Sequence, residues 1–195
     1  MNESQTLAVD GFFDPCTHTI TYVVADRMSG YCAVIEPVLG FDLHSGAINT
    51  IFADEVIRFI RDRDYKTEWI LETHAHADHL SAAQYLKTRT QGAVAIGNRI
   101  REVLCTFSKL FNLGSDFATD GSQFDYLFAD DEEFQLGNLS CKVMHTPGHT
   151  PACVSFLIGD NVFVGDTLFM PDYGTARTDF PGGDAATLYQ SIQDR

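Results

Sequence analysis

The chain contains 195 residues, of which 45% are hydrophobic and 21% charged, the proportions of an ordinary folded domain. Its formal net charge of −14 argues against nucleic acid as a partner, because nucleic-acid binding needs a basic surface, and it provides no polybasic attraction to anionic lipid. No apolar run approaches the roughly 18 residues of a membrane span, and residues 1–6 lack the basic and apolar regions of a signal peptide. We therefore expect a cytoplasmic protein that binds neither membranes nor nucleic acid.

The first half of the chain predicts a hairpin, a helix and a strand in that order. Residues 19–24 (TITYVV) and 31–36 (YCAVIE) are β-rich runs separated by a turn that contains Gly30, which predicts a β-hairpin. Apolar residues from Ile48 to Ile60 recur at helical spacing and predict a helix. Residues 69–71 predict a short strand that runs directly into a cluster of histidines.

The second half continues the alternation of helices and strands. Asp78 is a suitable N-cap for a helix that carries Leu80, Ala83 and Leu86, and residues 94–96 predict the next strand. We expect residues 101–133 to form a partly helical insertion over the functional site. Turns at residues 137–138 and 159–161 predict two hairpins, and residues 184–195 predict a final helix.

This alternation predicts a layered α/β fold with mixed sheets in a single domain that spans residues 1–195. The chain stops inside its last predicted helix without a closing strand, so we expect that a C-terminal part of the domain is missing. The five cysteines (16, 32, 105, 141 and 153) are scattered and contain no CxxC pair. They predict reduced and mostly buried thiols; a catalytic cysteine is the less favoured alternative.

The segment LETHAHADHL, residues 71–80, is the strongest chemical signal in the chain. On extended backbone His74 and His76 share one face, Asp78 continues that face, and His79 lies beside it. Such convergence suits one metal ion or two adjacent ions. Solvated loop histidines are the competing interpretation, which we disfavour because the cluster directly follows an apolar strand.

Two later segments offer further ligands. HTPGHTPACVSFL contains His145 and His149, and its Pro-Gly turn would present His149 at the end of a strand. NVFVGDTLF places Asp166 at the end of another strand, where a carboxylate could bind one metal, bridge two, or only cap a helix. We expect His145 to be structural or to support a ligand rather than to bind metal itself.

The motifs H-A-H-A-D-H, T-P-G-H-T and G-D-T-L-F, in this order over nearly the whole chain, resemble the metallo-β-lactamase superfamily. The resemblance implies an αββα sandwich of two mixed β-sheets flanked by helices, with the metal site at one edge of the sheets. It also implies one metal position formed by His74, His76 and His149, and a second formed by Asp78, His79 and a shared Asp166. A further histidine that usually completes the second position is absent after His149, so the chain either lacks it with its missing end or uses one metal.

The segment GTARTDFPGGDAATLYQSI, residues 174–192, resembles the corresponding part of the persulfide dioxygenases, although it has Ala-Arg where the shorter members have Gly-Arg. In that group a single Fe(II) is bound by the counterparts of His74, His149 and Asp166. Two histidines and one carboxylate leave coordination positions for a thiolate and O₂. His76 and Asp78 would then hydrogen-bond ligands or water.

The resemblance also implies residues for substrate binding. The planar guanidinium of Arg177 suits a carboxylate of glutathione, unless it pairs structurally with Asp179 or Asp172. Tyr173 is predicted in the same pocket. The leading hypothesis is an iron-dependent dioxygenase that converts glutathione persulfide, or a related low-molecular-weight persulfide, and O₂ to sulfite and glutathione, with one Fe(II) per chain.

Two other functions stay open at this point. A binuclear hydrolase of glutathione thioesters, like glyoxalase II, would bind two Zn ions or a mixed Fe/Zn pair per chain, and Asp78 would act catalytically by positioning or deprotonating a metal-activated water. An inactive metal-bound binding module is the third possibility. The sequence leaves both a monomer and a homodimer open.

Overall fold

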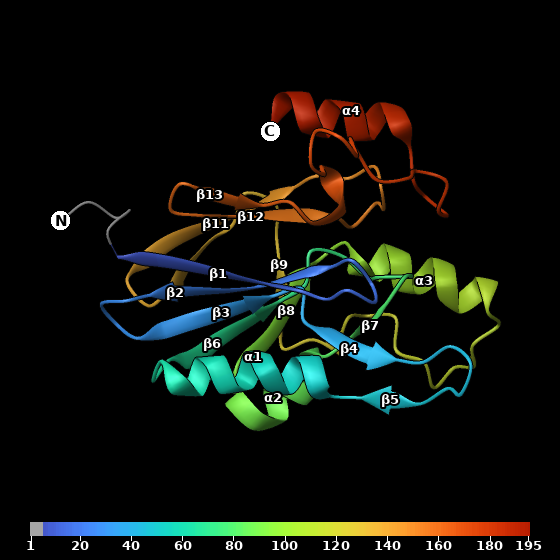
Figure 1. Cartoon of the computed structure of the whole chain (residues 1–195). Coiled ribbons are helices and arrows are strands. Elements are labelled where there is room, and N and C mark those ends of the chain that lie inside the picture. Colours follow the sequence, from blue (N-terminus) through green and yellow to red (C-terminus); the bar gives the residue numbers. More distant parts are fainter. Residues whose placement is uncertain (1–5) are drawn as a thin grey trace. The chain divides into compact units, whose positions relative to one another are not determined.

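The computed structural model describes residues 6–195 (Figure 1). The chain divides into two compact units that interleave along the sequence. Unit 1 contains the described residues up to 72 together with 76–94 and 135–140, and unit 2 contains 73–75, 95–134 and 141–195. The predicted lack of a signal peptide rests largely on residues 1–5, which lie outside the described part of the chain.

Unit 1 holds most of the N-terminal elements. They are β1 (Leu7–Phe13), β2 (Ile20–Asp26), β3 (Tyr31–Ile35), β4 (Val38–Phe41), β5 (Ile48–Asn49), α1 (Ile51–Asp62), β6 (Lys66–Leu71), β7 (Leu80–Ser81) and α2 (Ala83–Thr90). Strands β1, β2, β3 and β6 lie side by side in this order. The first three are antiparallel, whereas β3 and β6 are parallel and end together at Ile35 and Leu71. The sheet is therefore mixed, as predicted.

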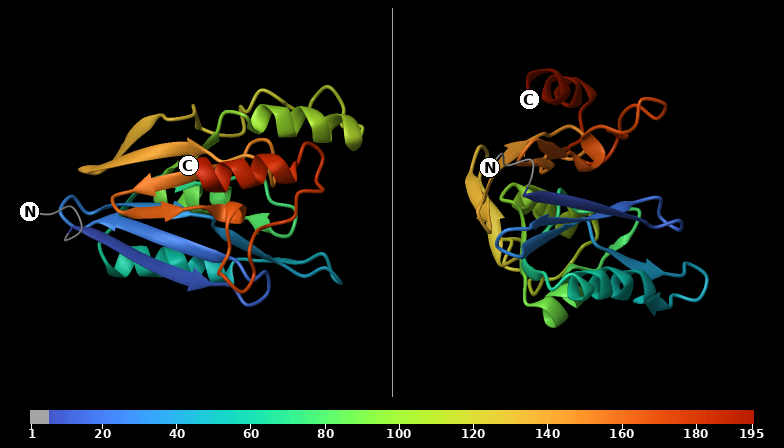
Figure 2. Two further views of the ribbon diagram at one scale, coloured as in Figure 1. Left: turned by 90° about the horizontal axis from the view of Figure 1, so that it is seen from above. Right: turned by 60° about the vertical axis from the view of Figure 1, so that its left-hand side comes forward.

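The predicted hairpin and helix of unit 1 are confirmed. Gly30 adopts a φ of 77° in the turn between β2 and β3, a conformation that glycine reaches without steric cost. Helix α1 buries Ala53, Val56, Ile57 and Ile60, the spacing of one helical face. Figure 2 shows α1 and α2 running side by side, and α2 packs against β6.

Two predicted helix starts were wrong because short strands replace them. Ile48 belongs to β5, which pairs with β4, so α1 begins only at Ile51. Asp78 does not cap a helix: Leu80 and Ser81 form β7, which pairs with Leu39 and Val38 of β4. Helix α2 therefore begins at Ala83. The strand pairing is a tertiary interaction that overrides the local helical pattern.

Unit 2 contains the elements of the C-terminal half. They are α3 (Ile100–Leu110), β9 (Tyr126–Phe128), β12 (Val154–Ile158), β13 (Asn161–Phe163), the 3₁₀ turn η2 (Gly165–Thr167) and α4 (Ala185–Asp194). Three further strands cross the boundary between the units: β8 (Ala93–Gly97), β10 (Glu133–Leu136) and β11 (Leu139–His145). Within unit 2, β8 and β9 are parallel, and β11, β12 and β13 form antiparallel neighbours. The predicted strands, hairpin turns and final helix are confirmed.

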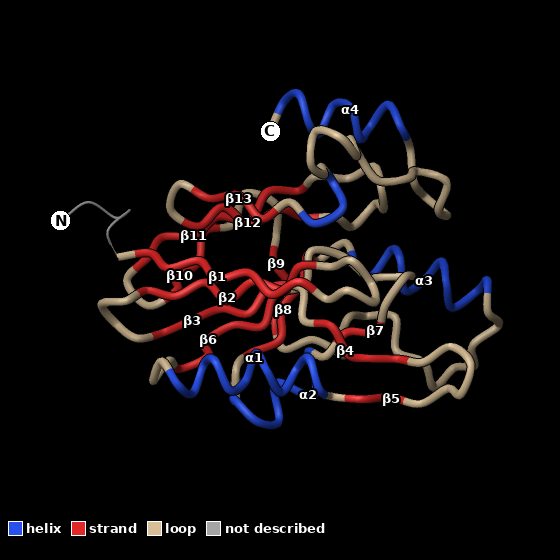
Figure 3. The backbone as a smooth tube through the Cα atoms, in the orientation of Figure 1, coloured by secondary structure: helices blue, strands red, loops and turns tan. Residues whose placement is uncertain are grey.

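The insertion predicted over residues 101–133 is partly helical. It begins within α3 and contains β9, and the long connection between these elements carries no helix or strand (Figure 3). Ile96, Ile100, Val103 and Ala152 form a buried cluster against which α3 and this connection pack. Among residues 6–195, no helix is long and apolar enough to cross a membrane. Mixed sheets flanked by helices match the predicted α/β class.

Candidate metal centre

Three potential metal ligands gather in unit 2. The ligand atoms of His74, His149 and Asp166 all lie within 4.8 Å of one another. Nε2 of His74 lies 3.8 Å, and Nε2 of His149 lies 3.5 Å, from Oδ2 of Asp166. The two imidazole rings meet edge to face, with centroids 4.9 Å apart. We refer to these three residues as the His74–His149–Asp166 triad.

His74 is oriented by the residue before it. The carbonyl of Thr73 accepts a hydrogen bond from the backbone N–H of Val154 at 2.9 Å, which ties this short segment to β12. The Thr73 hydroxyl then contacts Nδ1 of His74 at 2.9 Å, and both side chains are buried. This contact directs Nε2 of His74 toward Asp166.

His149 lies in the tight turn between β11 and β12. The turn is closed by hydrogen bonds from the Thr146 N–H to the Cys153 carbonyl, at 2.9 Å, and from the Gly148 N–H to the Thr150 carbonyl, at 3.0 Å. Nδ1 of His149 lies 2.7 Å from the carbonyl oxygen of Arg177. Because a carbonyl only accepts, Nδ1 carries the proton and Nε2 presents its lone pair to the triad.

Asp166 comes close to His74 because the backbone at Gly165 packs against Thr73. Gly165 has a φ of 51°, and a Cβ at this position would lie 2.2 Å from Oγ1 of Thr73, so only glycine lets the turn η2 pass so near His74. The next residue, Thr167, contacts the Thr146 hydroxyl at 3.0 Å, and Thr146 contacts Ser155 at 3.0 Å. This buried row of hydroxyls fixes η2 to β11 and β12.

The geometry of the triad fits a bound metal ion. Metal–ligand bonds of about 2.0–2.2 Å separate neighbouring ligand atoms by roughly 3–3.5 Å, close to the nitrogen–oxygen distances in the triad. Both histidines have an outer hydrogen bond on Nδ1, the arrangement that orients metal-binding imidazoles. Two imidazoles and one carboxylate suit Fe, Zn or Mn. The chemistry of the donor set therefore supports a metal cofactor.

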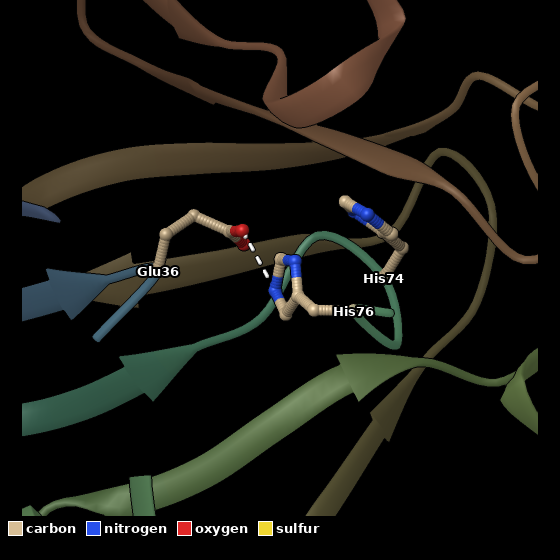
Figure 4. Close-up of side chains that lie close together, drawn as sticks. All are labelled: Glu36, His74 and His76. Atoms are coloured by element: carbon tan, nitrogen blue, oxygen red, sulfur yellow. Dashed lines mark ion pairs between the residues drawn. The ribbon is translucent and has the colours of Figure 1, made fainter. Parts of the chain in front are cut away.

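His76 has a different environment, in unit 1. Its Nε2 lies 2.8 Å from Oε2 of Glu36 and 3.1 Å from Oε2 of Glu72, and the Ser81 hydroxyl donates a short hydrogen bond to the other oxygen of Glu72. Figure 4 shows the Glu36–His76 ion pair, together with His74 from the same loop. Burial alone lowers the pKa of His76, but the two carboxylates raise it well above its ordinary value. For the acidic group of Glu72, burial has the opposite effect and raises the pKa.

Asp78 and His79 form a second group with His76, in which the ligand atoms lie within 4.8 Å of one another. The rings of His76 and His79 stack with centroids 4.1 Å apart. Nδ1 of His79 lies 3.3 Å from Oδ2 of Asp78, and neither buried ring nitrogen of His79 meets the geometric criteria of a hydrogen bond with the described residues. The nearby His79 ring holds the pKa of the half-exposed Asp78 below its ordinary value.

The remaining predicted site residues lie on the surface of unit 2. Arg177 forms a two-pronged ion pair with Asp179, at 2.5 and 2.6 Å, which is the structural pairing considered from the sequence. Tyr173 is 81% exposed. His145 contacts the Pro151 carbonyl through Nε2 at 2.9 Å, so it braces the turn that carries His149, as expected of a structural residue.

Sequence reasoning did not find Glu36, Glu72 or Thr73. Glu72 and Thr73 stand immediately before His74, and Glu36 follows the end of β3. Because β3 and β6 are parallel and end together, the residues that follow them lie at one edge of the sheet. A charged residue at the end of each apolar run was the available signal, but it acquires meaning only once the two strands are known to be neighbours.

Comparison with known proteins identifies the family. A model of the metallo-β-lactamase superfamily matches residues 16–195. The chain belongs to this superfamily. The solved structure of ETHE1 from Myxococcus xanthus superimposes with a TM-score of 0.70 and 29% identity, covering 95% of this chain and 68% of that one. The predicted superfamily and its sandwich fold are therefore confirmed.

The relatives carry the names of both hydrolases and oxygenases. A probable metallo-hydrolase of Burkholderia pseudomallei is 53% identical over 96% of this chain, and glyoxylase B2 of Dictyostelium discoideum is 51% identical over 88%. The mitochondrial persulfide dioxygenase ETHE1 of Bos taurus is 28% identical over 94%. The chain spans 67%, 59% and 60% of these relatives' own lengths. Membership of this superfamily indicates a metal-dependent enzyme. The names of the relatives are compatible with a hydrolase and with a dioxygenase.

Proposed function

We propose that the protein is an iron-dependent persulfide dioxygenase with one Fe(II) bound by His74, His149 and Asp166. The reaction is glutathione persulfide + O₂ + H₂O → glutathione + sulfite + 2 H⁺, in which the terminal sulfur is oxidised and O₂ is reduced. The observation that carries the proposal is the triad, in which two imidazole nitrogens and one carboxylate oxygen lie within 4.8 Å of one another in a single unit.

The surroundings of the triad support this chemistry. Iron bound there would supply the redox activity and the open coordination positions that a persulfide and O₂ require. The Arg177 carbonyl keeps the proton of His149 on Nδ1, and the Thr73 hydroxyl orients His74. His76 contributes no third imidazole while its Nε2 contacts Glu36 and Glu72, which favours one metal over two.

The choice of substrate is supported by sequence likeness. The ARTDF segment, residues 176–180, resembles that of the persulfide dioxygenases, and a relative with that printed name aligns over 94% of this chain. We therefore propose glutathione persulfide, or a related small persulfide, as the substrate. The cytoplasmic location remains a prediction from the sequence.

Oxygen consumption tests the proposal directly. The anaerobically purified, iron-loaded full-length protein should consume O₂ when glutathione persulfide is added and should release one sulfite for each O₂. Glutathione alone should give no uptake and serves as the substrate control. If the iron-loaded protein consumes no O₂ with any small persulfide, the dioxygenase proposal is wrong.

A second candidate is a binuclear hydrolase of glutathione thioesters. It is favoured by the His76–Asp78–His79 group, by the buried His79 nitrogens that lack hydrogen bonds with described residues, and by the names of the relatives that are more than 50% identical. Two Zn ions, or Fe and Zn, would then be bound, and the half-exposed Asp78 would position or deprotonate water. Two metals per chain together with hydrolysis of S-lactoylglutathione would favour this function over the first.

A further inference from the structure

The segment that follows η2 surrounds His149 with three kinds of contact. The Arg177 carbonyl accepts the Nδ1 proton at 2.7 Å. The Phe180 ring meets the imidazole edge to face, with centroids 5.2 Å apart and an interplanar angle of 87°. Gly183 lies so close that an added Cβ would be 3.0 Å from the His149 carbonyl oxygen. We call residues 177–183 the His149 clamp.

The side chain of Arg177 holds the clamp together. Its Nε and one terminal nitrogen bind the two oxygens of Asp179 at 2.5 and 2.6 Å, and its guanidinium carbon lies 4.9 Å from the centre of the Phe180 ring. The hydrogen bonds from Arg177 lower the pKa of Asp179 to about 2, so the carboxylate stays charged at neutral pH. The Arg177 guanidinium therefore contacts both Asp179 and the Phe180 ring that packs against His149, while the carbonyl of the same residue binds Nδ1 of His149.

The clamp is also closed by its own backbone. The Gly183 N–H donates to the Phe180 carbonyl at 2.7 Å, and the Asp184 N–H donates to the Gly148 carbonyl at 2.9 Å, on the residue just before His149. A Cβ at Gly183 would lie 2.4 Å from the Thr178 carbonyl oxygen. Glycine is therefore required at this position for the clamp to close around His149.

We propose that Arg177 and Asp179 are positioning residues that hold His149 in the orientation and tautomer needed for metal binding, and that Arg177 does not bind the substrate carboxylate. This inference rests on the proposed metal-binding role of His149. Outer hydrogen bonds of metal-binding histidines change metal affinity by about 10–100-fold when they are lost. The pair itself is exposed to solvent, so its effect is on the local orientation of His149 rather than on global stability.

Titration with Co(II) separates positioning from substrate binding, because its visible absorption reports ligand geometry without turnover. Arg177→Ala and Asp179→Ala should each weaken Co(II) binding by about 10-fold and shift the absorption bands. The double variant should be no weaker than either single variant, since both remove the same pair. Asp179→Asn keeps one acceptor and should lie between Asp179→Ala and the wild type.

Lys142→Ala is the matched control. It removes another exposed ion pair of unit 2, Lys142–Asp131 at 2.7 Å, which touches no triad residue. Its Co(II) affinity and spectrum should equal those of the wild type. Gly183→Ala disturbs the clamp without changing any charge and should reproduce the loss of affinity. Thermal unfolding of each apo variant checks that the fold is retained, and the Nδ1–H resonance of His149 should broaden or shift in the clamp variants only.

The opposite pattern would overturn the inference. If Arg177→Ala raises the KM for glutathione persulfide while Co(II) affinity and spectrum stay unchanged, Arg177 binds substrate and the proposed function stands. If Arg177→Ala changes neither quantity, the residue has no role in the site. If His149→Ala itself binds Co(II) as well as the wild type, the metal site proposed above is wrong, and this result is distinct from failure of the clamp.

Discussion

His74 and His76 stand two residues apart in the same loop, yet they are held by different chemistry. In unit 2, His74 contacts a hydroxyl through Nδ1 and faces one half-exposed carboxylate at 3.8 Å. In unit 1, Nε2 of His76 contacts two buried carboxylates at 2.8 and 3.1 Å. The first environment suits an imidazole that binds a cation. The second suits an imidazolium that balances two negative charges.

A histidine-rich motif therefore does not by itself define a ligand set. An imidazole serves as a metal ligand when its outer partner orients it without taking its second nitrogen. Two buried carboxylates instead favour the protonated ring, which has no lone pair to offer. The environment of each ring, more than its spacing in the sequence, separates a one-metal site from a two-metal site.

The largest effect is expected from breaking the triad. Asp166→Ala and His74→Ala should each lose more than about 100-fold in metal affinity, because a direct ligand matters more than the outer contacts that supply 10–100-fold. Metal analysis by mass spectrometry of anaerobically prepared protein measures this. His145→Ala is the control and should retain most of the metal, since His145 contacts a backbone carbonyl outside the triad. Equal metal content in Asp166→Ala and the wild type would refute the ligand assignment.

The next largest effect is expected from removing the His76 ring, which contacts Glu36 and Glu72 in unit 1. His76→Ala leaves Glu36 and Glu72 buried without their shared cation, and removing one partner of a buried ion pair costs about 3–5 kcal/mol of stability. Urea unfolding of the apo protein should show this loss, whereas replacement of the exposed His44 should change little.

The number of metal ions bound per chain shows whether His76 is a metal ligand in the holoprotein. If one metal is bound per chain, the folded His76→Ala protein should keep it. A fall from two metals to one in this variant would instead place His76 among the ligands and favour the binuclear hydrolase.

A smaller effect is expected from substituting Gly165, whose backbone packs against Thr73 and brings Asp166 close to His74. In Gly165→Ala the new methyl group would lie 2.2 Å from Oγ1 of Thr73, the atom that orients His74, and the left-handed backbone adds roughly 1–2 kcal/mol of strain. We expect about a 10-fold loss of metal affinity, the lower end of the range for outer contacts. Gly174→Ala also has a positive φ but an open surrounding, so it controls for backbone strain alone. Equal losses in both variants would mean that the Thr73 contact is unimportant.

Much of the fold could be predicted from the sequence, because its signals are local. The β2–β3 hairpin, the apolar face of α1 and the helical pattern of α4 each depend on residues close together in the chain. The three motifs likewise identified His74, His149 and Asp166 as candidate ligands, although His149 lies in the turn between β11 and β12 and Asp166 lies in η2 rather than at strand ends. Local patterns failed at β5 and β7, because a two-residue strand exists only through its partner β4.

The partners of the histidines could not be predicted for a different reason. Glu36 and Glu72 meet His76 only because β3 and β6 are parallel neighbours. Arg177 acts on His149 through its main-chain carbonyl, an atom that every residue possesses. A sequence pattern identifies side-chain chemistry, but it does not reveal which backbone carbonyl faces a ring. The sequence points to the guanidinium of Arg177, and its binding of a substrate carboxylate stays a prediction.

The smallest expected effect comes from a buried thiol. Cys32 is fully buried in β3, and burial raises the pKa of its thiol to about 11. At pH 8, alkylation of the native protein should modify the exposed Cys16 and Cys105 and leave Cys32 unmodified, as peptide mass spectrometry can show. Modification of Cys32 at the same rate as Cys16 would contradict its burial.

The same thiol predicts how stability depends on pH. Because the pKa is higher in the folded than in the unfolded state, the proton on Cys32 stabilises the fold below the unfolded value of about 8.5. This stabilisation is lost as the pH rises toward 11. Between pH 8 and about pH 9.5 the wild type should therefore lose about 1 kcal/mol more than Cys32→Ala in urea unfolding. An equal loss in both proteins would show that another group dominates. Burial thus favours the neutral thiol of Cys32, whereas two carboxylates favour the charged ring of His76.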